Sequence, residues 1–262
     1  MFGFLKRRRR ERLLATPLPP AWTAVLQDSV AHYRRLPPDA RRRLEGLVQV
    51  FLAEKRFEGC GGFALTDEAR LIVAGQACVL LLEREHDFYP LLDSILIYPA
   101  GFVTNEEMEE VEGVVGVDDG ERTGESWSQG AMVLSWEDIA LDIREPDDGW
   151  NVVYHEFAHQ LGDETGADDG VPVLPDPERQ RAWAEVLGRE YEALVRAFER
   201  GRRTFFDDYG ADSPAEFFAV ATEHFFEQPA QLKIKHPDLY EQLRLFYGQD
   251  PVTLPRDPRA RR

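Results

Sequence analysis

The sequence predicts an α+β protein in which a helical layer precedes a small sheet and a second group of helices. Over residues 18–86, apolar residues recur at helical spacing. Between residues 95 and 136, short β-branched and apolar segments alternate with glycine and proline. After residue 150, three long stretches return to the helical period. Strands that follow helices, rather than alternating with them, are typical of the α+β class.

Composition and length set the domain organisation that we expect. The chain has 262 residues, of which 43% are apolar and 30% charged, as in ordinary soluble globular proteins. We expect a single domain over residues 18–250, helical over 18–86 and containing the sheet and the later helices over 87–250. The arginine-rich residues 1–17 are expected to form a flexible basic arm, and the proline-containing residues 251–262 an irregular tail.

Charge and cysteine content restrict the partners and the compartment. The net charge of −17 argues against direct binding to nucleic acid. A run of 18 apolar residues and a secretory signal are both missing, so we expect no membrane span. Only Cys60 and Cys78 are present, too few for a disulfide framework, which favours a reducing compartment and hence the cytoplasm.

Proline and capping residues divide the first part of the chain into helices. Pro19 and Pro20 open a stretch with helical spacing to about Leu36, and Pro37-Pro38 ends it and starts the next helix. Thr66 is the expected N-cap of a third helix, from Asp67 to about Glu83. Further on, Asp176-Pro177 starts a long helix that we expect to end near Arg200.

Four short segments have the composition of strands. The first three are Ile95–Tyr98, Phe102-Val103 and Val114–Val117. The fourth, Ala131–Trp136, follows an expected bend at Gly130 and lies shortly before the next helical stretch.

That next stretch, residues 151–161, contains His-Glu-x-x-His within a mostly apolar helical pattern. Residues four apart share a helix face, so His155 and His159 are predicted to approach one metal ion. Glu156 lies one position round the helix, where it is placed to act as a general base. Asp147-Asp148-Gly149 is the predicted N-cap region and Gly162 the residue beyond the helix.

A catalytic zinc needs a third protein ligand, and the residues alone leave several candidates. Ser213-Pro214 starts an apolar helix in which Glu216 stands at the third position. Ser-x-x-Glu also forms a capping box that needs no metal. The alternatives to Glu216 are Glu223, His224, Asp163 and Asp168.

The motif at 155–159, together with Gly170-Val171-Pro172 and residues 209–220, resembles the Mlc titration factor A family of zinc peptidases. The upstream segments 124–127 and 133–136 are similar to it as well. The resemblance implies a zincin-like metallopeptidase domain with a small mixed sheet, related to the anthrax lethal factor catalytic domain. It implies His155, His159 and Glu216 as ligands of one Zn²⁺, Glu156 as base and Tyr209 facing the reaction centre.

One position departs from the family pattern. Gly162 stands where the family has an aspartate after the leucine that follows the second histidine, and Asp163 is shifted by one residue. This leaves the hydrogen-bond partner of His159 open.

Two functions follow from these expectations. The first is a zinc-dependent peptidase acting on a peptide or protein substrate, with residues of the strand before the motif helix (Ala131, Val133 and Ser135) as candidates for holding extended substrate. The second is a binding module with a structural zinc site, since the resemblance implies association with a glucose-responsive transcriptional repressor. The intact Glu156 favours the peptidase, because a structural site does not require that carboxylate.

Overall fold

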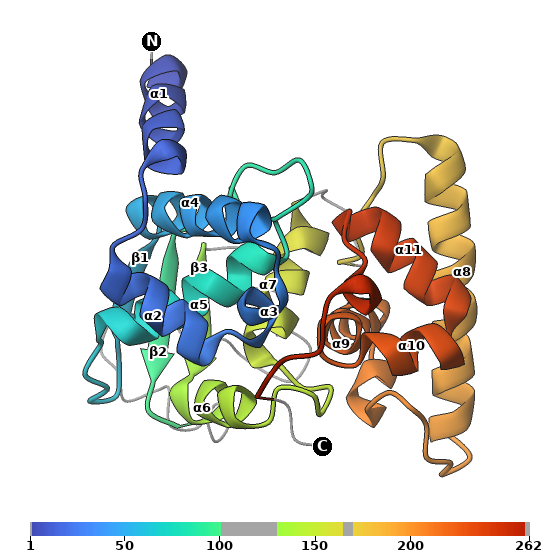
Figure 1. Cartoon of the computed structure of the whole chain (residues 1–262). Coiled ribbons are helices and arrows are strands. Elements are labelled where there is room, and N and C mark those ends of the chain that lie inside the picture. The colour runs from blue at the N-terminus through green and yellow to red at the C-terminus, as the bar shows by residue number, and fades with distance from the viewer. Residues whose placement is uncertain (1, 101–129, 165–169, 260–262) are drawn as a thin grey trace.

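The computed structural model describes residues 2–100, 130–164 and 170–259 (Figure 1). A layer of helices covers a small sheet, and a second group of helices lies beside them (Figure 1). Buried apolar side chains from Leu18 to Tyr247 form one core cluster that both groups share. The predicted α+β class is confirmed. None of the described helices is long and apolar enough to cross a membrane.

The helices predicted for residues 18–86 are present, and proline residues begin two of them. They are α2 (Pro20–Ser29), α3 (Ala31–Arg35), α4 (Pro38–Glu54) and α5 (Asp67–Val79). The first predicted helix is thus interrupted at Val30, which has extended backbone angles. Thr66 caps α5 as expected, since its hydroxyl accepts the Ala69 N–H.

The expected flexible arm is instead helix α1 (Phe2–Ala15), whose charges hold it in place. Arg10 donates two hydrogen bonds of 2.7 Å to the Glu54 carboxylate of α4, and it also pairs with Asp87. Its guanidinium lies 4.6 Å from the centre of the Phe88 ring. A bidentate arginine–carboxylate pair fixes direction as well as distance, so the basic residues anchor this segment.

The described part of the sheet is parallel, with strand order β1-β2-β3. The strands are β1 (Arg56–Gly59), β2 (Ser94–Tyr98) and β3 (Ala131–Ser135). An antiparallel strand, which the expected mixed sheet requires, is not among the described residues. Ile95 of β2 is in register with Met132 of β3, and both are buried. Strand β1 was not predicted, because its four residues begin only one residue after α4 and carry two charges. The predicted strands at 102–103 and 114–117 lie outside the described residues.

The helices after the sheet place the motif helix at the centre of the molecule. They are α6 (Trp136–Arg144), α7 (Val152–Asp163), α8 (Pro177–Phe198), α9 (Pro214–Glu227), α10 (Pro229–Lys235) and α11 (Pro237–Tyr247), with 3₁₀ turns η3 (Asp208–Ala211) and η4 (Pro251–Thr253). Helix α9 lies between α7 on one side and α8, α10 and α11 on the other (Figure 1).

Residues 254–259, which follow η4 without regular secondary structure, contact the N-terminal layer. The Asp257 carboxylate accepts a hydrogen bond of 2.8 Å from Arg34, and both side chains are buried. An isolated buried charge is costly, so each of these residues requires the other.

Candidate metal centre and active site

Helix α7 begins later and ends later than its sequence signals indicate. The side chain of Asn151 is its N-cap and accepts the Tyr154 N–H at 2.9 Å. The prediction that residues 147–149 cap this helix is therefore wrong. The helix also continues through Gly162 to Asp163. Regular α-helix therefore extends both before His155 and after His159.

Three side chains converge above α7. His155 Nε2 and His159 Nε2 lie 3.2 Å apart, as the shared helix face requires. Glu216 Oε2, from α9, is 3.0 Å from the first nitrogen and 3.3 Å from the second. These three are the one group of potential metal ligands found among the described residues.

The spacing of these atoms fits a tetrahedral metal site. Zinc bonds to nitrogen and oxygen of about 2.0–2.1 Å in a tetrahedral arrangement place neighbouring ligand atoms about 3.3–3.4 Å apart. The observed separations of 3.0, 3.2 and 3.3 Å are close to that edge length. Two imidazoles and one carboxylate form the donor set of a three-ligand site with one coordination position left for water or substrate.

Glu223, an alternative candidate for the third ligand, contacts His155 at Nδ1, on the opposite side of the ring from Glu216. Its Oε1 is 2.8 Å from His155 Nδ1, and its Oε2 accepts the Asn151 N–H at 2.6 Å. Because Nδ1 faces Glu223, Nε2 is the ring nitrogen that faces His159 and Glu216. Glu223 is therefore placed to orient the His155 ring, in the position that carboxylates take behind metal-bound histidines.

Glu216 is held at the first turn of α9 by the start of that helix. The Ser213 hydroxyl accepts the Glu216 N–H at 3.1 Å, and Pro214 follows the cap, both as predicted. Burial disfavours the Glu216 carboxylate, but hydrogen bonds with His155 and His159 outweigh it and lower its pKa to about 2. Burial likewise opposes charge on His155, while Glu216 and Glu223 outweigh it and raise its pKa to about 10. In the metal-free site, a positively charged His155 therefore pairs with the negatively charged Glu216.

Glu156 lies beside this group with an unused oxygen. Its Oε2 is buried and has no hydrogen-bond partner within the described part of the chain. Burial raises the pKa of Glu156, against the attraction of His155 and His159. Next to a candidate metal site, this carboxylate oxygen is placed to accept a proton.

Tyr209, in η3, faces the same group. Its ring centre lies 5.8 Å from that of His155, and 47% of the residue is exposed. Burial of the hydroxyl, together with Glu216 and Glu156, raises the pKa of Tyr209 to about 12, so the phenol keeps its proton at neutral pH. Tyr209, His155 and Glu156 all line one cavity of about 490 Å³.

The other candidates from the sequence lie elsewhere. Both ring nitrogens of His224 face backbone carbonyls, those of Val220 and Phe205. Ser135 is buried and caps α6 through the Asp138 N–H, and none of the strand candidates Ala131, Val133 and Ser135 lines the cavity. Asp168 lies outside the described residues.

Gly162 and Asp163 occupy the positions at which the chain departs from the family pattern. Asp163 lies four residues after His159 in α7, on the same helix face, and burial raises the pKa of its carboxyl group while His159 opposes that shift. A Cβ atom at Gly162 would lie 1.8 Å from the Gly170 carbonyl oxygen, which no side chain permits. The close approach of these two segments requires glycine at position 162.

Two residues of the site were not predicted. Asp142 of α6 is buried and accepts the Val152 N–H at 2.9 Å, which fixes the first turn of α7. Asn151 also stabilises this turn, because its side chain accepts the Tyr154 N–H. The signal for α6 was present, since Ser135 followed by Glu137 and Asp138 is a helix start, but the preceding strand pattern extended through it.

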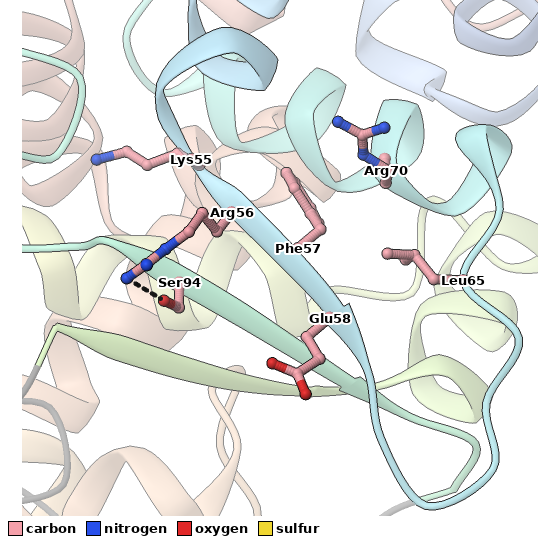
Figure 2. Close-up of a pocket in the computed structure, with 7 residues that line it drawn as sticks. All are labelled: Lys55, Arg56, Phe57, Glu58, Leu65, Arg70 and Ser94. Carbon is pink, nitrogen blue, oxygen red and sulfur yellow. Dashed lines mark hydrogen bonds between the residues drawn. The ribbon is translucent and has the colours of Figure 1, made fainter.

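A second cavity, of about 820 Å³, opens at the edge of the sheet near β1 (Figure 2). Arg56 and Glu58 of β1 and Arg70 of α5 line it, and Arg56 reaches Ser94 of β2 (Figure 2). None of the candidate metal ligands or catalytic residues lies there.

Comparison with known proteins supports a hydrolytic metal centre. The family model for glucose-regulated metallo-peptidase M90 matches residues 4–248. The chain belongs to this family. As a family member it is related to metallopeptidases that depend on a metal cofactor, and the matched range contains all three converging side chains.

Individual relatives cover nearly the whole chain. An uncharacterised protein of Synechocystis sp. is 43% identical over 93% of this chain and 89% of its own. Mlc titration factor A of Escherichia fergusonii is 33% identical over 89% of this chain and 87% of its own. Mlc titration factor A of Klebsiella pneumoniae is 34% identical over 83% and 82%. The family resemblance stated from the motifs is confirmed.

Proposed function

We propose that this member of the M90 family is a zinc-dependent peptidase of the His-Glu-x-x-His plus Glu type, with His155, His159 and Glu216 as ligands. The observation that carries the proposal is the convergence of three ligand atoms within 3.0–3.3 Å beside the unpartnered Glu156 oxygen. Zinc is favoured among metals because two imidazoles and one carboxylate are a typical set for catalytic zinc.

Glu156 is the general base in this proposal. When bound, Zn²⁺ supplies a Lewis acid that polarises the substrate carbonyl and lowers the pKa of a coordinated water to about 7. Glu156 accepts the proton of the attacking water and delivers it to the leaving amine. The burial that raises its pKa makes the carboxylate a stronger base and a competent acid for the second step.

Tyr209 and Glu223 assist without exchanging protons with the substrate. The Tyr209 hydroxyl, protonated at neutral pH, donates a hydrogen bond to the oxyanion that develops on the scissile carbonyl. Glu223 holds the His155 ring so that its Nε2 lone pair faces the metal.

The decisive experiment compares the wild type with Glu156→Gln at matched zinc content. Glutamine keeps the size of the side chain but accepts no proton, so we expect kcat/KM for short peptides to fall by at least about 10²–10⁴-fold. Zinc content should stay the same. Glu185→Gln, on the exposed face of α8, is the control and should retain full activity. Equal trace activity in the wild type and in Glu156→Gln would refute the peptidase.

Repressor binding is a second proposed function, and it can coexist with the first. The relatives named Mlc titration factor A support it, together with the resemblance to that family. Binding of a transcriptional repressor does not need Glu156, so Glu156→Gln should bind it as tightly as the wild type does. A reducing compartment such as the cytoplasm suits both functions, since Cys60 and Cys78 are free thiols.

A further inference from the structure

The cavity next to the metal centre is strongly acidic. It extends from His155, Glu156 and Tyr209 to the space between α6 and the segment that leads into α7. Among the described residues, its lining includes five carboxylates and neither lysine nor arginine. The carboxylates are those of Asp138, Asp142, Asp148, Glu156 and Glu223.

The carboxylates divide into an inner and an outer group. Asp142 and Glu223 are buried and already accept backbone N–H groups of the α7 start. Asp138 and Asp148 are exposed at the mouth. Burial first, then Glu223, Asp148 and Asp138, raise the pKa of Asp142 to about 7, which shows that these charges repel one another. A positive charge entering the cavity would relieve that repulsion.

Apolar surface accompanies the acidic residues. Trp150 is 49% exposed and Leu141 45% exposed, and both line this cavity. Large apolar side chains at a cavity mouth can cover the methylene stem of a long charged side chain. An indole face also attracts a cation. Volume and lining together suit a long cationic side chain better than a bare ammonium group.

We propose that this cavity is the subsite that selects substrate, and that it takes a lysine or arginine side chain of the peptide next to the scissile bond. Asp138 and Asp148 attract the cationic end, and Leu141 and Trp150 pack against its stem. The proposal rests on the proposed peptidase function and names its substrate class.

The first test measures binding alone, in zinc-loaded Glu156→Gln. The probes are N-acetylated peptides that differ at one position, which holds lysine, norleucine or glutamate, placed in turn on either side of the same peptide bond. We expect lysine to bind about tenfold more tightly than norleucine on one of the two sides, and glutamate to bind most weakly. The preference should shrink as ionic strength rises toward 1 M, where the Debye length is about 3 Å.

The second test assigns the preference to the named residues. In Asp138→Asn and Asp148→Asn, each lost charge should reduce the lysine-to-norleucine ratio about 2–5-fold, as exposed ion pairs do. The Asp148→Asn change keeps a side-chain oxygen that can accept the Trp150 N–H, as Asp148 does. Asp147→Asn is the matched control, because Asp147 is also exposed but lines a different cavity. It should leave the ratio unchanged.

The outcomes separate this proposal from the peptidase itself. Norleucine binding as tightly as lysine on both sides, or an equal effect of Asp147→Asn, would overturn the subsite. So would a lysine preference that is missing in the acetylated peptides and appears only in a matched set with a free N-terminus, since the cation would then be the α-ammonium group. Absence of hydrolysis by the wild type, with the lysine preference retained in binding, would instead refute the peptidase and leave the cationic site in place.

Discussion

Replacing Glu223 by glutamine should weaken zinc binding without abolishing it. Both oxygens of this buried carboxylate are in use: Oε1 pairs with His155 Nδ1 and Oε2 with the Asn151 N–H. Glutamine turns one oxygen into an NH₂ group. That group would face a donor, either the imidazole or the backbone, so one of the two contacts must be lost.

The size of the effect follows from the position of Glu223 behind a ligand. Loss of a partner that orients a metal-bound histidine typically costs about 10–100-fold in affinity, or about 1.4–2.7 kcal/mol. Glu216→Gln removes one of the three proposed ligands and should cost more. In the metal-free protein, Glu223→Gln leaves a buried donor unsatisfied, which costs about 1–3 kcal/mol of folding free energy.

The assay is a zinc titration against a competing chelator, combined with thermal unfolding of the metal-free forms. Glu190→Gln is the matched control, because Glu190 makes the same 2.8 Å contact with an imidazole, that of His236, far from the site. Its zinc affinity should equal that of the wild type. If Glu223→Gln lost zinc more completely than Glu216→Gln did, our assignment of ligand and orienting residue would be reversed.

Four more predictions follow from contacts described above. The pKa of metal-free His155 is raised to about 10, so zinc binding at pH 7.5 should release at least about one proton, and zinc affinity should rise with pH up to about 10. Calorimetry in buffers of different ionisation enthalpy measures the proton release. The pairing of His155 stabilises the metal-free fold below pH 6.5, and this contribution should be lost as pH rises through about 10. Tyr209→Phe should lower kcat by about 10²–10³-fold while zinc affinity stays constant, and unchanged kcat would remove the oxyanion role. Asp257→Ala should lower the unfolding free energy by about 3–5 kcal/mol, measured by urea denaturation, because the Arg34 charge stays buried without its carboxylate partner. A loss below about 1 kcal/mol would mean that this pair does not hold the tail.

The local parts of the site could be predicted from the sequence because helix geometry decides them. His155 and His159 meet since residues four apart share a face, whatever surrounds the helix. Ser213 and Pro214 start α9 for equally local reasons, and they place Glu216 in its first turn. The α+β class followed from the order of periodic segments, which is also a property of the chain alone.

The positions of Glu216 and Glu223 relative to His155 were decided only by the tertiary structure. Both acids lie on one face of α9, so helical spacing leaves either as a ligand. Packing of α9 against α7 places Glu216 at the Nε2 side of His155 and Glu223 at its Nδ1 side. The docking of α1 through Arg10 depends in the same way on Glu54 and Asp87, which are distant in sequence. Contacts between distant segments carry no local signal, because each residue is compatible with exposure until its partner is in place.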